Sequence, residues 1–285
     1  MKRLFILILA LPLLWGVERL CHRATDGFAM VNVYAPKGEY QKWHREGTFP
    51  QELVGQTFIY LNSGSQSYVF VSEDGSTVLK LFKFQHMRTP PILDFLPDTG
   101  LLAKKRAKKR ALLEQTFESL CLAYDQMREE TGLIALHLDQ TSHGYPTITL
   151  VDKIGKRHQV DLNHIEFLLQ KKGTLVYDAI GQWMAEGNIA QAQAALRSLL
   201  HLAVSRCHKG IFDKDPDFHT NFGFVETIPF QIDFGRLSIA PEEKNPDVYA
   251  PEMIRITREF ESWIAENHPL LLDLFIEELH EITTH

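Results

Sequence analysis

Residues 207–237, with the sequence CHKGIFDKDPDFHTNFGFVETIPFQIDFGRL, gather carboxylates, one amide and a DFG tripeptide in a short stretch. Turn-forming residues surround three aspartates, and the two short apolar runs after Asn221 predict a β-hairpin. A hairpin places the residue before its first strand beside the residue after its second, so we expect Asn221 and Asp233 to be neighbours. The three aspartates that precede the hairpin are Asp213, Asp215 and Asp217.

These side chains suit phosphoryl transfer. Mg²⁺ prefers oxygen ligands, and proteins hold it with one or two carboxylates or amides together with phosphate oxygens. Asn221 and Asp233 could supply these ligands. A further carboxylate must accept the proton or hydrogen bond of the attacking hydroxyl group, and the three preceding aspartates are candidates for this base. The alternative is a Ca²⁺-like acidic turn or a merely solvated loop.

The stretch resembles the catalytic loop and DFG motif of the protein-kinase-like superfamily. In the H-R-D-x-x-x-x-N form of that loop the base lies five residues before the Asn, a position that Pro216 occupies here. Asp215 lies six residues before Asn221 and Asp217 lies four before it. We favour Asp215 as the base, although the segment 217–221 also resembles a shortened D-x-H-x-x-N loop of aminoglycoside and sugar phosphotransferases.

Composition describes a globular chain. With 285 residues, 45% of them hydrophobic, the chain can bury a large core as one two-lobed domain or two small ones. A net charge of −6 argues against a nucleic-acid partner. The three cysteines, Cys21, Cys121 and Cys207, are widely spaced and show neither a disulfide framework nor a zinc motif.

The N-terminal residues have features of a segment that directs a protein to a membrane or to export. Lys2 and Arg3 precede an apolar run over residues 4–17 that has the length and basic flank of a signal peptide. We therefore interpret residues 1–24 as a signal peptide or membrane anchor. This predicts a membrane-associated or exported protein, and the side of the membrane on which the folded part lies is left open. Residues 25–55 are interpreted as a lead-in to the folded part.

Three strands are predicted over residues 57–61, 67–71 and 77–84, because these runs are rich in β-branched and aromatic residues and are separated by turn signals. They predict an antiparallel meander. Sheets that begin in this way resemble the first lobe of kinase-like proteins.

The first turn of this meander resembles the kinase glycine-rich loop G-x-G-x-x-G-x-V. Asn62, Gly64 and Ser67 stand at the glycine positions, Val69 stands at the valine, and Ser65 lies in the same turn. Small residues allow backbone N–H groups to approach phosphate, and Asn tolerates positive φ. The resemblance implies a nucleotide-phosphate site, and an ordinary hairpin turn is the alternative.

Lys80 stands where the kinase V-A-I-K motif has its lysine, sixteen residues after Gly64. A lysine in an apolar strand needs a carboxylate or a phosphate as partner. The resemblance implies that Lys80 binds phosphate and that a glutamate of the next helix orients it. Apolar residues recur at helical spacing over 101–130, and Glu114 and Glu118 on this helix are both candidates.

The same helix carries the basic run KKRAKKR at residues 104–110. Its charges repel one another and oppose the dipole at a helix start. The run predicts a solvated face, or alternatively a contact with an anionic membrane surface or an acidic substrate.

The remaining chain is predicted to finish a small sheet and then to become helical. Strands are expected at 133–138, 146–151 and 156–162, with residues 150–153 as the adenine-binding hinge that the resemblance implies. Helices are expected at 165–171, 175–185, 189–207, 251–266 and 269–282. The Ala-Pro-Glu at 250–252 matches the family's A-P-E motif, but a proline in the first turn of a helix explains it equally well.

Together these features predict an α+β, two-lobed, kinase-like fold. The expected divisions are a nucleotide-binding lobe at 56–160 with an antiparallel sheet and one helix, and a mainly helical lobe at 161–285. The resemblance implies ATP and Mg²⁺ as cofactors and transfer of a phosphoryl group to a hydroxyl of a small molecule, sugar or protein. The alternative is a pseudokinase that serves as a membrane-associated interaction module.

Overall fold

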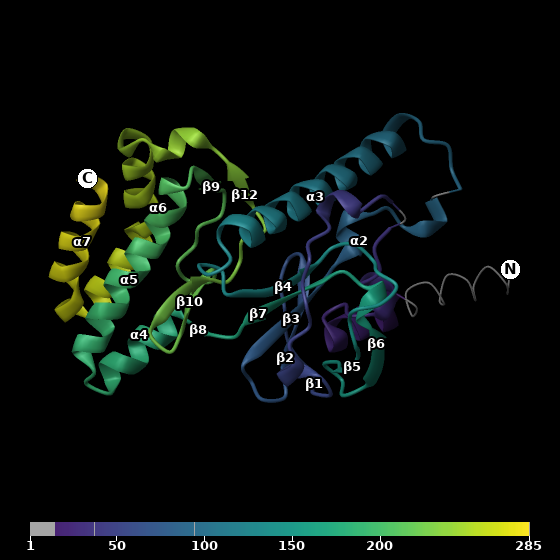
Figure 1. Cartoon of the computed structure of the whole chain (residues 1–285), viewed down its shortest axis with the longest axis horizontal. Coiled ribbons are helices and arrows are strands. Elements are labelled where there is room, and N and C mark those ends of the chain that lie inside the picture. The colour runs from purple at the N-terminus through teal and green to yellow at the C-terminus, as the bar shows by residue number, and fades with distance from the viewer. Residues whose placement is uncertain (1–14, 37, 94, 285) are drawn as a thin grey trace, which may run out of the picture. The chain divides into compact units, whose positions relative to one another are not determined.

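The computed structural model of the chain describes residues 15–36, 38–93 and 95–284. They form two compact units, whose elements are labelled in Figure 1. The first takes the described residues up to Arg110 together with His137–Leu169, and the second takes Ala111–Leu136 and the described residues from Gln170 onward. The expected α+β class is confirmed, because strands dominate the first unit and helices the second.

A sheet of seven strands in the order β4-β7-β3-β2-β1-β5-β6 is present among the described residues. The predicted meander is confirmed, since β1 pairs with β2 and β2 with β3, both antiparallel. The division between the two units passes through β4 and β7. The strands are β1 (Thr57–Ser63), β2 (Ser67–Ser72), β3 (Thr77–Phe82), β4 (Leu133–His137), β5 (Thr147–Val151), β6 (Arg157–Asp161) and β7 (Phe167–Lys171).

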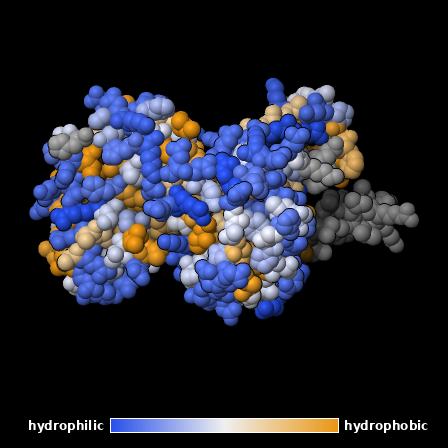
Figure 2. All heavy atoms as spheres, viewed as in Figure 1, coloured by the Kyte–Doolittle hydropathy of each residue, from blue (hydrophilic) through white to orange (hydrophobic). Residues whose placement is uncertain are grey.

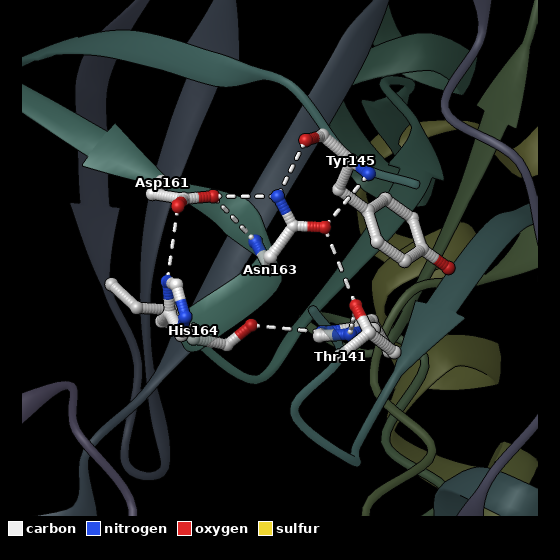
Figure 3. Close-up of polar contacts among 7 residues, drawn as sticks. Thr141, Tyr145, Asp161, Asn163 and His164 are labelled. Atoms are coloured by element: carbon white, nitrogen blue, oxygen red, sulfur yellow. Dashed lines mark hydrogen bonds and ion pairs between the residues drawn. The ribbon is translucent and has the colours of Figure 1, made fainter. Parts of the chain in front are cut away.

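The hairpin of β5 and β6 extends the sheet beyond β1, to which β5 pairs in parallel. One buried amide joins the two ends of this hairpin (Figure 3). Asn163 Nδ2 donates to the carbonyl of Tyr145 at 2.8 Å and to Asp161 Oδ1 at 2.7 Å, and Asn163 Oδ1 accepts the backbone N–H of Tyr145 at 3.0 Å. Thr141 donates to the same amide oxygen, and His164 contacts Asp161. The amide therefore fixes the hairpin's base.

Two expectations about this sheet were wrong. Residues 165–171 were predicted as a helix but contain strand β7, because a short apolar run does not by itself distinguish a buried strand from a buried helix. Residues 150–153 were predicted as the hinge, yet Leu150 and Val151 lie within β5 and pair with both β1 and β6. Their backbone groups are thus used inside the sheet.

The expected membrane association or export is contradicted. Among the described residues, no helix has the length and apolar character needed to cross a bilayer. Residues 15–25 are helical, and Trp15, Val17 and Leu20 on this helix are exposed. Residues 1–14, which hold most of the predicted apolar run, lie outside the described residues.

The predicted lead-in packs on one face of the sheet. The ring of Phe28 contacts those of Tyr68 and Phe70 edge-on, at centroid distances of 5.1 and 5.3 Å. Tyr68 donates its hydroxyl hydrogen to the carbonyl of Gly27 at 2.6 Å. The lead-in therefore covers buried side chains of β2.

Two cations of the basic run serve the fold of the first unit. Arg106 donates to the carbonyls of Leu93 and Leu96, and Lys109 donates to those of Gln85 and His86. These bonds attach the segment after β3 to helix α3 (Gly100–Gln126). Part of the run is thus structural rather than a free basic surface.

The second unit is built around helix α5, whose inner face is fully buried against the neighbouring helices. On the face shown in Figure 2, hydrophilic residues predominate and hydrophobic ones are scattered among them. The predicted helices at 175–185, 189–207, 251–266 and 269–282 are present. The third begins five residues earlier than predicted and the fourth three residues later, and the other ends differ by at most two residues. They are α4 (Val176–Ala185), α5 (Ile189–His208), α6 (Pro246–Asn267) and α7 (Leu272–Thr284).

Short elements complete the described chain. Two small sheets, in the orders β11-β10-β8 and β12-β9, lie in the second unit. Their strands are β8 (Thr174–Leu175), β9 (Ile211–Asp213), β10 (Phe222–Val225), β11 (Ile228–Gln231) and β12 (Leu237–Ile239). The remaining helical segments are α2 (Phe84–Met87) and the 3₁₀ turns η1 (Met30–Asn32), η2 (Gln41–Trp43), η3 (Gln51–Leu53), η4 (Pro91–Leu93), η5 (Leu162–His164), η6 (Pro241–Lys244) and η7 (Pro269–Leu271).

Candidate functional site

The hairpin predicted within residues 207–237 is present and brings Asn221 and Asp233 together. Phe222 at the start of β10 lies opposite Gln231 at the end of β11. Just beyond this pair, the N–H of Ile232 donates to the carbonyl of Asn221 at 2.7 Å, and the N–H of Asp233 reaches the same oxygen at 3.4 Å. The two predicted Mg²⁺ ligands therefore stand at neighbouring strand ends.

Asp213, at the end of β9, is buried and holds the start of the loop. One carboxylate oxygen accepts the N–H of Asp215 at 3.0 Å, and the other accepts Gln231 Nε2 at 2.6 Å. Burial raises the pKa of Asp213, while these hydrogen bonds and the nearby Arg206 oppose that rise. Asp213 thus positions the loop from inside the protein, with only 2% of its surface exposed.

Asp215 is exposed, and its backbone is held by the predicted metal ligand. Asn221 Nδ2 donates to the carbonyl of Asp215 at 2.6 Å. The Asp215 carboxylate lies 3.5 Å from Arg236 Nη1, just after the DFG. This bond links the backbone of Asp215 to the side chain of Asn221 across the loop.

Asp217 closes the turn. Its two carboxylate oxygens accept the N–H of His219 at 2.9 Å and the hydroxyl of Thr220 at 2.7 Å. Its carbonyl accepts the N–H of Asn221 at 2.9 Å. Because both oxygens of Asp217 are used within the loop, the geometry favours Asp215 over Asp217 as a group that could meet an acceptor.

The DFG turn is held by Gln231, a residue that sequence reasoning missed. Asp233 Oδ1 accepts the N–H of Gly235 at 3.1 Å, and Phe234 is buried. Gln231 Nε2 donates both to Asp213 and to the carbonyl of Asp233, the latter at 2.9 Å. The available signal was a glutamine in an apolar strand, which needs hydrogen-bond partners when buried.

Ser119 on α3 is a second anchor of the DFG segment that the sequence did not reveal. Its hydroxyl donates to the carbonyl of Phe234 at 2.5 Å and accepts the N–H of Leu237 at 2.6 Å. Ser119 is 1% exposed. It lies beside Glu118, but nothing in the sequence distinguishes its small side chain from others on a helix.

Replacing Ser119 by Ala should lower the free energy of unfolding by about 2 kcal/mol, because a buried carbonyl and a buried N–H lose their shared partner. Urea denaturation measures this change. The matched control is Ser198→Ala, whose exposed hydroxyl bonds within its own helix and whose loss should cost less than about 0.5 kcal/mol. Equal losses in the two variants would contradict the anchoring role.

In the first unit, a short turn over residues 64–66 joins β1 to β2. Asn62 lies opposite Val69, and the N–H of Gly64 donates to the carbonyl of Ser67 at 2.9 Å, so that Ser65 stands at the tip. Positive φ was considered for Asn62, but this residue is not among the described residues with positive φ. Gly64 is likewise not among the described glycines with positive φ, so the backbone of this turn does not itself require glycine.

Lys80 and Val69 lie directly opposite each other on β3 and β2. This register places the two residues that resemble the kinase lysine and valine side by side on one face of the sheet. Lys80 is half-buried, in a strand whose other residues are buried. On α3, Glu114 is half-buried whereas Glu118 is exposed, so the two candidate carboxylates differ in environment.

Lys83 is a third residue whose role the sequence did not reveal, since the sequence suggested only an edge-strand lysine that guards against aggregation. Its Nζ donates to Ser63 Oγ and to the carbonyl of Gly64, both at 2.5 Å, and lies 4.7 Å from the ring centroid of Tyr68. Burial lowers the pKa of Lys83. The ammonium group therefore fixes the turn from the side of the Tyr68 ring. Lys80 lies opposite Val69, the next residue of β2, whose side chain points to the other face of the sheet.

The Ala-Pro-Glu sequence lies within α6. This helix begins at Pro246 with Asn245 as its N-cap, so Pro251 lies inside the helix and not in its first turn. Glu252 forms an ion pair with Arg206 at 2.6 Å. The explanation of the motif by a helix start was therefore wrong.

Comparison with known proteins finds weak similarity to solved structures. No protein family and no curated protein matches the chain. Similar solved structures include the bifunctional kinase-methyltransferase WbdD, with a TM-score of 0.38, 16% identity, and coverage of 75% of this chain and 42% of that one. Another is Rv3197 from Mycobacterium tuberculosis in complex with erythromycin, with a TM-score of 0.34, 15% identity, and coverage of 75% and 52%.

The matched region spans about half or less of each of these two proteins. The description of WbdD includes a kinase. With TM-scores below 0.5, these are weak similarities of structure.

Proposed function

We propose that the chain is a phosphotransferase that moves the γ-phosphoryl group of ATP to a hydroxyl group of a small molecule, sugar or protein. The observation that carries this proposal is the connected arrangement of Asn221, Asp233 and Asp215. An amide and a carboxylate leave adjacent strand ends, and the amide also holds the backbone of an exposed aspartate. Phosphoryl transfer needs these three groups as metal ligands and base.

Asn221 and Asp233 would hold Mg²⁺, because an amide and a carboxylate oxygen are the donors that this hard ion accepts from proteins. When bound, the metal supplies charge neutralisation at the phosphate oxygens. Asp215 would accept the hydrogen of the attacking hydroxyl group. Asp213 and Gln231 would keep the loop and the DFG turn in place through their buried hydrogen bonds.

In the first unit, Lys80 and the N–H groups of the turn at residues 62–67 would bind phosphate oxygens. The register of Lys80 opposite Val69 supports this assignment. Lys83 would act as a positioning residue, because its ammonium group is already used by Ser63 and Gly64.

Incubation of the full chain with γ-labelled ATP, Mg²⁺ and separate acceptor classes tests the proposal. Sugars, hydroxyl-bearing small molecules and peptides with Ser, Thr or Tyr should be compared. Transfer of label to one class, lost in Asp215→Asn, is the expected result. Absence of transfer to every class, with ATP still bound, would instead favour the non-catalytic module.

A further inference from the structure

A thiol and two carboxylates that the proposed reaction does not use converge in the second unit. Cys207 lies near the end of α5, Glu243 lies in η6, and Glu252 lies in the second turn of α6. The Cys207 sulfur and one carboxylate oxygen of each glutamate all lie within 4.8 Å of one another. Three separate segments thus direct possible metal-binding atoms at one point.

The cluster is buried and one of its oxygen atoms has no partner. Cys207 is 0% exposed, Glu243 is 6% exposed, and the side chain of Glu252 is 10% exposed. Among the described residues, Glu243 Oε2 is buried without a hydrogen-bond partner. A buried carboxylate oxygen in this state is costly. It therefore indicates a missing cation or donor at the cluster.

The charges around the cluster favour a cation. Arg206 is 1% exposed and donates to Glu252 at 2.6 Å and to the carbonyl of Ile211 at 3.3 Å. Its single positive charge can balance only one of the two carboxylates when both are ionised. A divalent ion that displaces the thiol proton of Cys207 adds one net positive charge, so the ionised groups then balance.

The backbone around the cluster is firmly held. The N–H of Gly210 donates to the carbonyl of Cys207 at 2.7 Å, the N–H of Ala240 to that of Gly210 at 2.8 Å, and the N–H of Glu243 to that of Ala240 at 3.0 Å. Gly210 has φ +71°, and a Cβ there would lie 3.2 Å from the Pro241 Cα. This chain of bonds fixes Cys207 and Glu243 relative to each other.

We propose that Cys207, Glu243 and Glu252 bind one divalent transition-metal ion, with Zn²⁺ as the best match. A thiolate with two carboxylates suits this borderline ion better than Mg²⁺, which avoids sulfur. Metal–ligand distances of about 2.0–2.3 Å require only small side-chain movements from the observed spacing. Three protein ligands leave a fourth position for water, and the ion would tie α5, η6 and α6 together.

Titration of the metal-free full chain with Co²⁺ tests the site. The ion should bind in a ratio of about one per chain, with the thiolate-to-cobalt charge-transfer absorption that reports a sulfur ligand, and Zn²⁺ should displace it. Cys207→Ser should abolish the absorption. Glu243→Gln should weaken binding by about tenfold or more. The matched controls are Cys121→Ser, another buried cysteine, and Cys21→Ser, an exposed one; both should bind as wild type does.

The change in Tm on adding Zn²⁺ is a second readout, because each folded variant is compared with itself in the absence of metal. Zn²⁺ should raise the Tm of wild type and of Cys121→Ser equally, and should raise that of a folded Glu243→Gln by less at the same Zn²⁺ concentration. The proposal is overturned if folded wild type takes up no Co²⁺, if the absorption persists in Cys207→Ser, or if Cys21→Ser removes it. Because neither readout involves ATP, failure of this proposal is distinct from failure of the phosphotransferase assignment.

Discussion

Replacing Asp233 by Asn is expected to lower phosphoryl transfer on the order of 10³-fold, because the variant loses the charge that binds Mg²⁺ at the DFG turn. The amide of the variant keeps a similar shape and can still accept the N–H of Gly235, so the turn should persist. The measurement is kcat/KM for ATP with the accepting substrate. The loss should be accompanied by weaker binding of Mg·ATP.

The Asp215→Asn variant separates the role of the proposed base from that of the proposed metal ligand. It should lose transfer to a similar extent while it binds Mg·ATP as wild type does, since Asp215 is proposed to meet the acceptor and not the metal. Asp273→Asn, an exposed change on α7, controls for the altered net charge and should leave both readouts unchanged. Unchanged transfer in Asp233→Asn would contradict the metal site.

Between acidic and alkaline pH, wild type is expected to lose about 3 kcal/mol of unfolding free energy relative to the Glu166→Gln variant, which has no titrating group at this position. Burial raises the pKa of Glu166 to about 7, while hydrogen bonds from Gln140 and from the Ala35 backbone oppose this rise and the nearby Asp139 adds to it. The neutral form is favoured in the folded state. Glu166 therefore imposes no penalty below its unfolded pKa of about 4.5, and its penalty grows as the pH rises to about 7.

Urea unfolding of wild type and Glu166→Gln at pH 5 and pH 8 measures this difference. Relative to the variant, wild type should lose stability on going to pH 8. Glu281→Gln, an exposed change of the same charge on α7, should follow wild type at both values. If wild type and Glu166→Gln show parallel pH dependence, the buried carboxyl is not protonated in the folded state.

Much of the second unit could be predicted, because its local signals agree with its tertiary structure. The apolar stripe of α5 and the two runs after Asn221 specified a helix that leads to a loop and a hairpin. Hairpin geometry alone then placed Asn221 beside Asp233. In the first unit the meander itself was predicted, whereas the pairing of Val69 with Lys80 came only from the observed register.

Other features depend on partners that are distant in the sequence. The sequence predicts a helix where β7 lies, because a short apolar run is compatible with either conformation. Its neighbours in the sheet, β4 and β3, make it a strand. Ser119 and Lys83 became informative only when their partners were visible: the DFG backbone for the first and the β1–β2 turn for the second. The cluster around Cys207 joins segments that carry no spacing motif.

Calorimetric titration of the full chain with ATP, in the presence and absence of Mg²⁺, tests the central claim most directly. Wild type should bind ATP in a Mg²⁺-dependent manner, and both Asp233→Asn and Lys80→Ala should weaken that binding. Folded wild type that binds no ATP under either condition would contradict the phosphotransferase account.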